Sequence, residues 1–165
     1  MKPALLVIDI QNEYLKYISD QERGTGLYFI GELVKLFREK GHRIIRVYHH
    51  DENNGPEPDS KEFQFPESVK VLEDDPCIVK QFESAFRETG LDGLLRAEGI
   101  DALFLCGLSA VGCVMATYWG AYNSGYSVFM VREAVMSHSA ELTRSAMDVT
   151  EAVSPNLVQF MLEKL

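Results

Sequence analysis

The sequence predicts an α/β fold with three αβα layers around a doubly wound, mainly parallel sheet. Short apolar runs alternate along the chain with longer helical patterns, which is the arrangement of βαβ units. The runs are apolar almost throughout instead of alternating with polar residues, as in strands that are covered on both faces. A glycine also separates several helical patterns from the next apolar run, where it takes the left-handed conformation that ends a helix.

Each expected element rests on one of these patterns. Apolar runs rich in β-branched or aromatic residues predict strands at residues 4–9, 43–49, 77–80, 102–107 and 127–131. Helical patterns lie at residues 25–40, 90–98, 112–124 and 139–151. The expected helix ends are Gly41, Gly99 and Gly125. The polar segment 50–69 contains proline and glycine and predicts a long loop, of the kind that often carries function.

Length and charge narrow the class of protein. With 165 residues, we expect one domain over residues 1–165. The formal net charge of −9 argues against nucleic acid or an anionic membrane surface as a partner. No apolar stretch is long enough to span a bilayer, and the apolar run in the opening "MKPALLVIDIQ" is too short for a signal peptide.

The cysteines indicate a reducing compartment. The chain has three, an odd number that does not make a disulfide framework. We therefore expect a cytoplasmic location. Cys77 and Cys106 lie inside apolar runs and are expected to be small buried hydrophobic residues.

Three chemically useful residues follow predicted strand ends. Asp9 ends the first apolar run, Lys80 ends the third, and a Gly/Ser/Ala loop after the fourth leads to Cys113. Ligands of open α/β sheets bind beyond the carboxyl ends of the strands, so the sheet can gather these side chains in one crevice. Each residue also has an ordinary structural role open to it: a capping carboxylate, a solvated surface charge and a packing thiol, respectively.

Cys113 carries the strongest signal of the three. It lies at the predicted N-terminus of a helix, where aligned amides act as about half a positive charge. That field and a nearby lysine can lower a thiol pKa from about 8.5 to roughly 3.5–7.5, which favours the reactive thiolate. We therefore expect a lowered pKa for Cys113, with backbone N–H groups beside it that can receive an oxyanion.

Several spaced motifs extend this hypothesis over most of the chain. They are "LLVIDIQNEY" with its Asp and Gln, "VKQFESAFRETGLDGLLRAEGIDALFLCG" with Lys, Ser-Ala-Phe and Gly-Ile, and "GLSAVGCVMATYWGAYNSGYSV" with the cysteine. In this order they resemble the isochorismatase-like cysteine hydrolases, a family that includes nicotinamidases and N-carbamoylsarcosine amidase. The resemblance implies the isochorismatase-like hydrolase fold.

The resemblance also implies catalytic roles. Asp9, Lys80 and Cys113 would form a triad in which the thiol attacks a carbonyl carbon. The carboxylate would take the thiol proton and pass it to the leaving amine, while the ammonium would stabilise the thiolate.

Backbone features of the loop before Cys113 follow from the same resemblance. It implies a cis peptide bond between Leu108 and Ser109, and an oxyanion hole built from the N–H groups of Ser109 and Cys113. Two positions depart from the family pattern. Ala110 stands where a threonine is usual, which removes a hydroxyl that could brace the loop, and Glu133 stands where the family has aspartate.

Pocket residues are sought close to the triad in sequence. The candidates are Gln11, Tyr14, His49, Phe82, Phe86 and Trp119. Aromatic side chains can form an apolar wall for a small flat substrate, although helix-spaced aromatics also belong to cores. The cluster at 49–51, His-His-Asp, lacks the Asp-x-His spacing of the nicotinamidase metal site, so we expect neither a metal nor a cofactor.

The sequence therefore favours a hydrolase that cleaves a C–N bond in a small amide, ureide or carbamoyl compound through a thioester-type intermediate. The alternatives are an isochorismatase-type hydrolase of another small metabolite, a thiol redox protein and a non-enzymatic binding protein. True isochorismatases generally lack the cysteine, and the chain has no C-x-x-C pair for redox chemistry. We expect a small-molecule substrate and a homo-oligomer, since family members assemble and the C-terminal "SPNLVQFMLEKL" is apolar.

Overall fold

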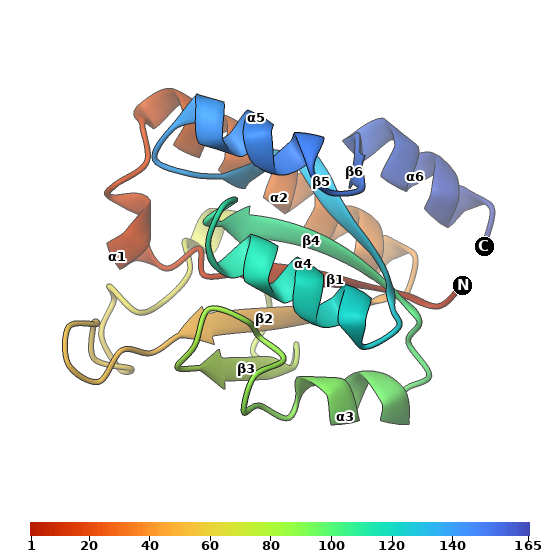
Figure 1. The fold of residues 1–165 in the computed structure, drawn as a ribbon, viewed down its shortest axis with the longest axis horizontal. Coiled ribbons are helices and arrows are strands. Elements are labelled where there is room, and N and C mark those ends of the chain that lie inside the picture. Colours follow the sequence, from red (N-terminus) through yellow and green to blue (C-terminus); the bar gives the residue numbers. More distant parts are fainter.

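The computed structural model describes residues 1–165 and contains a six-stranded sheet in which every pairing is parallel (Figure 1). The strands are β1 (Pro3–Ile8), β2 (Arg43–His49), β3 (Cys77–Lys80), β4 (Ala102–Leu108), β5 (Ser127–Met136) and β6 (Ala152–Val153). Their order across the sheet is β3-β2-β1-β4-β5-β6, which confirms the predicted doubly wound sheet. The two central strands, β1 and β4, are buried along their whole length, which explains their unbroken apolar sequences.

Helices cover both faces of this sheet (Figure 1). They are α1 (Asn12–Leu15), α2 (Asp20–Glu39), α3 (Leu91–Ala97), α4 (Cys113–Asn123), α5 (Ala140–Asp148) and α6 (Pro155–Glu163), with a 3₁₀ turn η1 (Glu67–Val69). One apolar core lies between the sheet and α3, α4 and α5, and the other lies between the sheet and α2 and α6. The predicted three-layer arrangement is therefore present. No helix is both long enough and apolar enough to cross a membrane.

Helix α2 begins five residues before the predicted start at residue 25. The Ser19 hydroxyl accepts a hydrogen bond from the N–H of Glu22, so a capped helix begins at Asp20. Gly24 and Gly26 then lie inside the helix, although glycine weakens a helical pattern. Gly26 has a packing reason, because a Cβ there would lie 2.2 Å from the sulfur of Met136.

Strand β5 also extends beyond its predicted end, from residue 131 to Met136. The exposed Arg132 and Glu133 interrupt the apolar run, which is why the pattern stops at 131. Glu133 has a φ of 62°, and the pairing of β5 with β4 shifts register at this point. The strand then resumes and carries the chain to the same edge of the sheet at which β1 and β4 end.

The C-terminal stretch forms β6 and α6, which the apolar pattern alone does not predict. The Ser154 hydroxyl accepts a hydrogen bond from the N–H of Leu157, and Pro155 occupies the first helical position. Val158 and Leu162 are buried in the same core as α2. The apolar end of the chain therefore packs on the molecule's own core through these side chains.

The two non-catalytic cysteines differ in exposure. Cys106 is fully buried in central strand β4, as expected. Cys77 is exposed, and the expectation that it is buried is wrong, because β3 forms the edge of the sheet.

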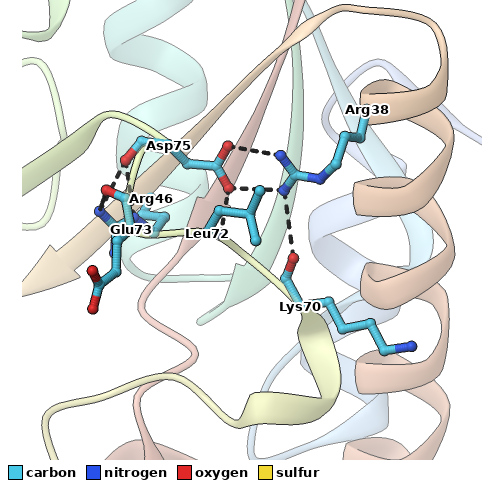
Figure 2. A network of polar contacts seen from close by, with 6 residues as sticks. All are labelled: Arg38, Arg46, Lys70, Leu72, Glu73 and Asp75. Carbon is cyan, nitrogen blue, oxygen red and sulfur yellow. Dashed lines mark hydrogen bonds and ion pairs between the residues drawn. The ribbon is translucent and has the colours of Figure 1, made fainter.

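Two arginines fasten the segment before β3 to the rest of the molecule (Figure 2). Arg38 of α2 donates to both carboxylate oxygens of Asp75, at 3.0 and 2.9 Å, and the N–H of Leu72 donates at 2.7 Å. Arg46 of β2 donates to the carbonyl oxygens of Asp75 and Glu73. Burial raises the pKa of the Asp75 carboxyl, but the hydrogen bonds outweigh it and the pKa lies below its usual 3.8.

We predict that Asp75→Ala lowers the free energy of unfolding by about 1–3 kcal/mol at pH 7, because it removes charge-assisted hydrogen bonds. A carboxyl with a lowered folded pKa stabilises above its unfolded pKa, and this contribution is lost as pH falls through the folded value. The difference in the free energy of unfolding between the unaltered protein and Asp75→Ala should therefore become smaller below pH 3.8. Denaturant unfolding of both proteins at several pH values measures this difference. Asp74→Ala is the matched control, since Asp74 is exposed, and an equal loss there would contradict the assignment.

Candidate active site

A buried ion pair lies at the carboxyl edge of the sheet. Lys80, the last residue of β3, places its Nζ 2.7 Å from Oδ2 of Asp9, which follows β1. The two side chains are 0% and 4% exposed, so both charges are out of water. β2 lies between β1 and β3 in the sheet, and the long lysine side chain spans this distance. The sheet thus brings together two of the three predicted catalytic residues.

The backbone at Asp9 is held in an unusual conformation. Its φ is 51°, in the left-handed region that non-glycine residues rarely occupy. The N–H of Asp9 donates to the carbonyl oxygen of Val47 at 2.9 Å, which fixes the turn out of β1. The second carboxylate oxygen, Oδ1, is buried and has no hydrogen-bond partner in the protein. One oxygen is therefore fixed by Lys80 while the other is free to take a proton.

His49, the last residue of β2, supports the ion pair, and Gln11, between β1 and α1, supports His49. The side-chain amide of Gln11 donates to the carbonyl oxygen of His49 and accepts from its N–H, at 3.0 and 2.7 Å. Lys80 Nζ lies 3.2 Å from His49 Nδ1. An ammonium group can only donate, so Nδ1 accepts and the neutral ring carries its proton on Nε2. Burial, with the Lys80 charge, lowers the pKa of His49.

Cys113 meets this pair as the first residue of α4. A carboxylate oxygen of Asp9, a ring nitrogen of His49 and the sulfur of Cys113 all lie within 4.8 Å of one another. The predicted triad is thus gathered at one place. Gly107, in the strand that leads to the loop, has a φ of 118°, and a Cβ there would lie 2.0 Å from the carbonyl oxygen of Ile8. Only glycine allows β1 and β4 to approach so closely here.

The loop between β4 and α4 is held by its own backbone. The Leu108–Ser109 peptide bond is cis, at the position implied by the resemblance. The N–H of Ala110 donates to the carbonyl oxygen of Met136 at 2.8 Å, and its methyl group is buried. This hydrogen bond braces the loop at the position where the hydroxyl of the usual threonine is missing. The N–H groups of Ser109 and Cys113 donate to no acceptor in the protein, so both remain available to a ligand.

The segment after Lys80, which contains the Ser-Ala-Phe motif at residues 84–86, is attached to α4. The buried Thr117 hydroxyl accepts a hydrogen bond from the N–H of Ala85 at 3.0 Å. Gly120 lies against this segment, where a Cβ would come within 2.7 Å of the Ser84 hydroxyl oxygen. The lysine and the cysteine are therefore held by elements that pack directly on each other.

The surroundings of the Cys113 thiol favour its protonated form. Burial and the neighbouring Asp9 carboxylate raise its pKa to about 12, while Lys80 opposes the rise. The expectation of a lowered thiol pKa is therefore wrong, because burial and a like charge outweigh the positive groups. Burial also raises the pKa of Asp9, against the effect of Lys80. An aspartate of raised pKa is a better base toward a thiol than an exposed one.

A cavity of about 240 Å³ opens onto the triad. Its lining residues are Asp9, Tyr14, Tyr17, Ile18, His49, Leu108, Ser109, Cys113 and His138. Tyr14 and His49 were predicted pocket residues, and their rings lie edge to face with centroids 6.1 Å apart. Gln11 lies behind the wall, where it holds the backbone of His49 as described above.

Three predicted pocket aromatics lie outside this cavity. Phe82 packs beneath the guanidinium of Arg87, which lies 3.7 Å from its ring centroid. Phe86 packs on the core between the sheet and α4, near Tyr126. Trp119 is 41% exposed on α4. Closeness in sequence to the predicted triad is a poor guide here, because none of these three rings lines the cavity.

Other wall residues were not predicted. Tyr17 and Ile18 follow the short helix α1, which has no clear periodic signal. His138 follows β5, and the hydroxyl of the buried Ser137 accepts from the N–H of Ser139 and orders this turn. Asp9 is a candidate because it follows the carboxyl end of a predicted strand. The same reasoning applies to His138 once the full length of β5 is known.

The histidine cluster at 49–51 does not converge on one point. Asp51 accepts hydrogen bonds from the N–H groups of Asn53 and Asn54, which form a turn. The His50 ring lies edge to face with Phe63, at a centroid distance of 6.1 Å. His49 alone reaches the triad.

Comparison with known proteins places this geometry in a family. The isochorismatase domain model matches residues 3–157. The chain belongs to the isochorismatase family. It is 32% identical over 149 residues to the isochorismatase family protein YddQ of Bacillus subtilis, covering 86% of this chain and 82% of that one.

Two solved structures of named amidases also share the fold. N-carbamoylsarcosine amidase from Thermoplasma acidophilum is 25% identical with a TM-score of 0.82, covering 94% of this chain and 98% of that one. The pyrazinamidase of Pyrococcus horikoshii, solved in complex with zinc, is 25% identical with a TM-score of 0.80, covering 93% and 99%. The chain is therefore an isochorismatase-family hydrolase whose relatives include amidases.

We predict that Lys80→Met lowers the free energy of unfolding by about 3–5 kcal/mol at pH 8, because it leaves the Asp9 charge buried and unpaired. The unpaired carboxyl has a folded pKa above its unfolded 3.8, so its cost is absent at acid pH and grows as pH rises. Denaturant unfolding at pH 5 and pH 8 measures both effects. The double variant Asp9→Asn/Lys80→Met should recover much of the loss, and a double variant as unstable as the sum of both single variants would contradict the pairing.

We also predict that Asp9→Asn lowers the pKa of the Cys113 thiol from about 12, because the repelling carboxylate is removed while Lys80 stays. The rate of alkylation by iodoacetamide against pH measures it. The background variant Cys77→Ser removes the other exposed thiol. If the pH midpoint of the alkylation rate is the same or higher in Asp9→Asn, the carboxylate does not affect the pKa of the sulfur.

Proposed function

We propose that the protein is a cysteine amidohydrolase that cleaves a C–N bond in a small amide, ureide or carbamoyl compound through a thioester-type intermediate. The observation that carries the proposal is the approach of Cys113 Sγ and an Asp9 carboxylate oxygen to within 4.8 Å, with Lys80 on the Oδ2 side of that carboxylate. The amidases among the structural relatives support the reaction class.

The first half of the reaction forms an S–C bond and breaks the C–N bond. Asp9 takes the thiol proton as the sulfur of Cys113 attacks the carbonyl carbon. The proton moves between two groups of the same buried site, so the net charge beside Lys80 does not change. The oxygen of the tetrahedral intermediate accepts hydrogen bonds from the free N–H groups of Ser109 and Cys113. Asp9 then gives its proton to the leaving nitrogen, and the acyl group remains on sulfur.

The second half hydrolyses the thioester. Asp9, again a carboxylate, takes a proton from a water molecule that attacks the acyl carbon. The S–C bond breaks, the carboxylic or carbamic acid leaves, and the proton returns to the sulfur. Lys80 stays charged throughout and stabilises whichever partner carries the negative charge.

A panel of small amides, ureides and carbamoyl compounds, assayed for ammonia or amine release, tests the proposal. Cys113→Ala should lower kcat/KM for any active compound by at least about 10³-fold, because the nucleophile is lost. Cys77→Ala is the matched control and should keep the activity, since Cys77 lies at the other end of β3 from Lys80. Intact-mass measurement should detect the acyl group on sulfur. Turnover that survives in Cys113→Ala would contradict the thiol mechanism.

A further inference from the structure

We propose that the substrate is an uncharged amide, and that the pocket rejects amides carrying a carboxylate. This inference rests on the proposed function, because it names the substrate class of the same site. It follows from the side chains and the charges that line the cavity.

The cavity has room for a small amide. Its volume is about 240 Å³, and an apolar cavity of about 150 Å³ is enough to hold a benzene molecule. Its apolar and aromatic lining residues include Tyr14, Ile18 and Leu108. A flat, apolar body fits such a wall, while the carbonyl oxygen points to the N–H groups of Ser109 and Cys113.

The charge of the wall excludes a second anionic group. The lining includes no arginine and no lysine, and its one carboxylate is that of Asp9. Lys80 lies behind the wall, and its ammonium is already hydrogen-bonded to Asp9 and His49. The charges of Asp9 and Lys80 cancel. A substrate carboxylate would therefore enter beside the carboxylate of Asp9 with no positive group to receive it.

Two further titratable groups of the wall, His49 and Tyr14, supply no charge at pH 8. Burial lowers the pKa of His49, which is therefore neutral. Burial and Asp9 raise the pKa of Tyr14 to about 12, so its hydroxyl stays protonated. The hydroxyl and the imidazole groups can hydrogen-bond to a neutral amide without favouring an anion.

Pairs of amides of matched shape, one neutral and one anionic, test at pH 8 whether the pocket prefers the neutral member (the charge rule). The pairs are (Z)-but-2-enamide with maleamate, and benzamide with 3-carbamoylbenzoate, in which a carboxylate replaces a methyl group or a hydrogen. We expect kcat/KM for ammonia release to be at least about 100-fold higher for the neutral member, because an unpaired charge costs several kcal/mol to bury. Equal or faster hydrolysis of the anionic members would overturn the inference.

A gain-of-function variant gives a second, independent readout. Tyr17 lies on the cavity wall and is 69% exposed, so an arginine fits there without a change in the core. Tyr17→Arg should raise the relative kcat/KM for the anionic member of each pair by at least about tenfold, through a charge-assisted contact to the carboxylate. Tyr28→Arg is the matched control, because Tyr28 is 63% exposed and does not line this cavity. An equal change in both variants, or none in Tyr17→Arg, would count against the inference.

Binding to Cys113→Ser separates this inference from the proposed function. If no compound is hydrolysed by the unaltered protein, the amidase proposal fails. Ligand-observed NMR with Cys113→Ser then measures binding of the same pairs without turnover. Preferential binding of the neutral members supports the charge rule, whereas preferential binding of the anionic members, or no binding of either, overturns it.

Discussion

The buried ion pair between Lys80 and Asp9 is the constraint on which the rest of the site depends. Two opposite charges with almost no exposure are stable only in close contact, here at 2.7 Å. The contact fixes Oδ2 of the carboxylate, and a carboxylate oxygen of Asp9 lies within 4.8 Å of the sulfur of Cys113. In the proposed mechanism, the negative charge of this carboxylate passes to the sulfur as the thiol proton moves to Asp9. Burial raises the pKa of the thiol, which disfavours a free thiolate, and it raises the pKa of the carboxyl, which makes Asp9 a stronger base.

Backbone features around the pair serve its geometry. Asp9 adopts a left-handed conformation, and Gly107 leaves room for the carbonyl oxygen of Ile8 on the neighbouring strand. Positions of this kind store conformational free energy that the surrounding packing must offset. Here the offset comes from central strands β1 and β4, which are buried throughout. Two fully buried central strands thus lead directly to Asp9 and to the loop before Cys113.

Much of the fold and of the triad could be predicted from the sequence, because each depends on local patterns. Unbroken apolar runs and glycine helix ends identify a parallel sheet, and the sheet identifies its own carboxyl edge as the place where Asp9 and Lys80 meet. The cavity wall could not be predicted in the same way. Tyr17 follows a four-residue helix without periodicity, and His138 follows a strand whose apolar run is interrupted at Arg132. The direction of the thiol pKa was also out of reach, because it depends on burial and on a carboxylate far away in the sequence.

The separation of the site residues along the chain has a consequence for how the protein matures. Asp9 and Lys80 are 71 positions apart, and Cys113 comes later still, on a helix that begins after the fourth strand. No contiguous fragment shorter than the span from Asp9 to Cys113 contains all three residues. A nascent chain therefore lacks the complete site until most of the sheet has been assembled. If Cys113 reacts as proposed, its reactivity distinguishes a native molecule from a compact one in which the strands are wrongly paired.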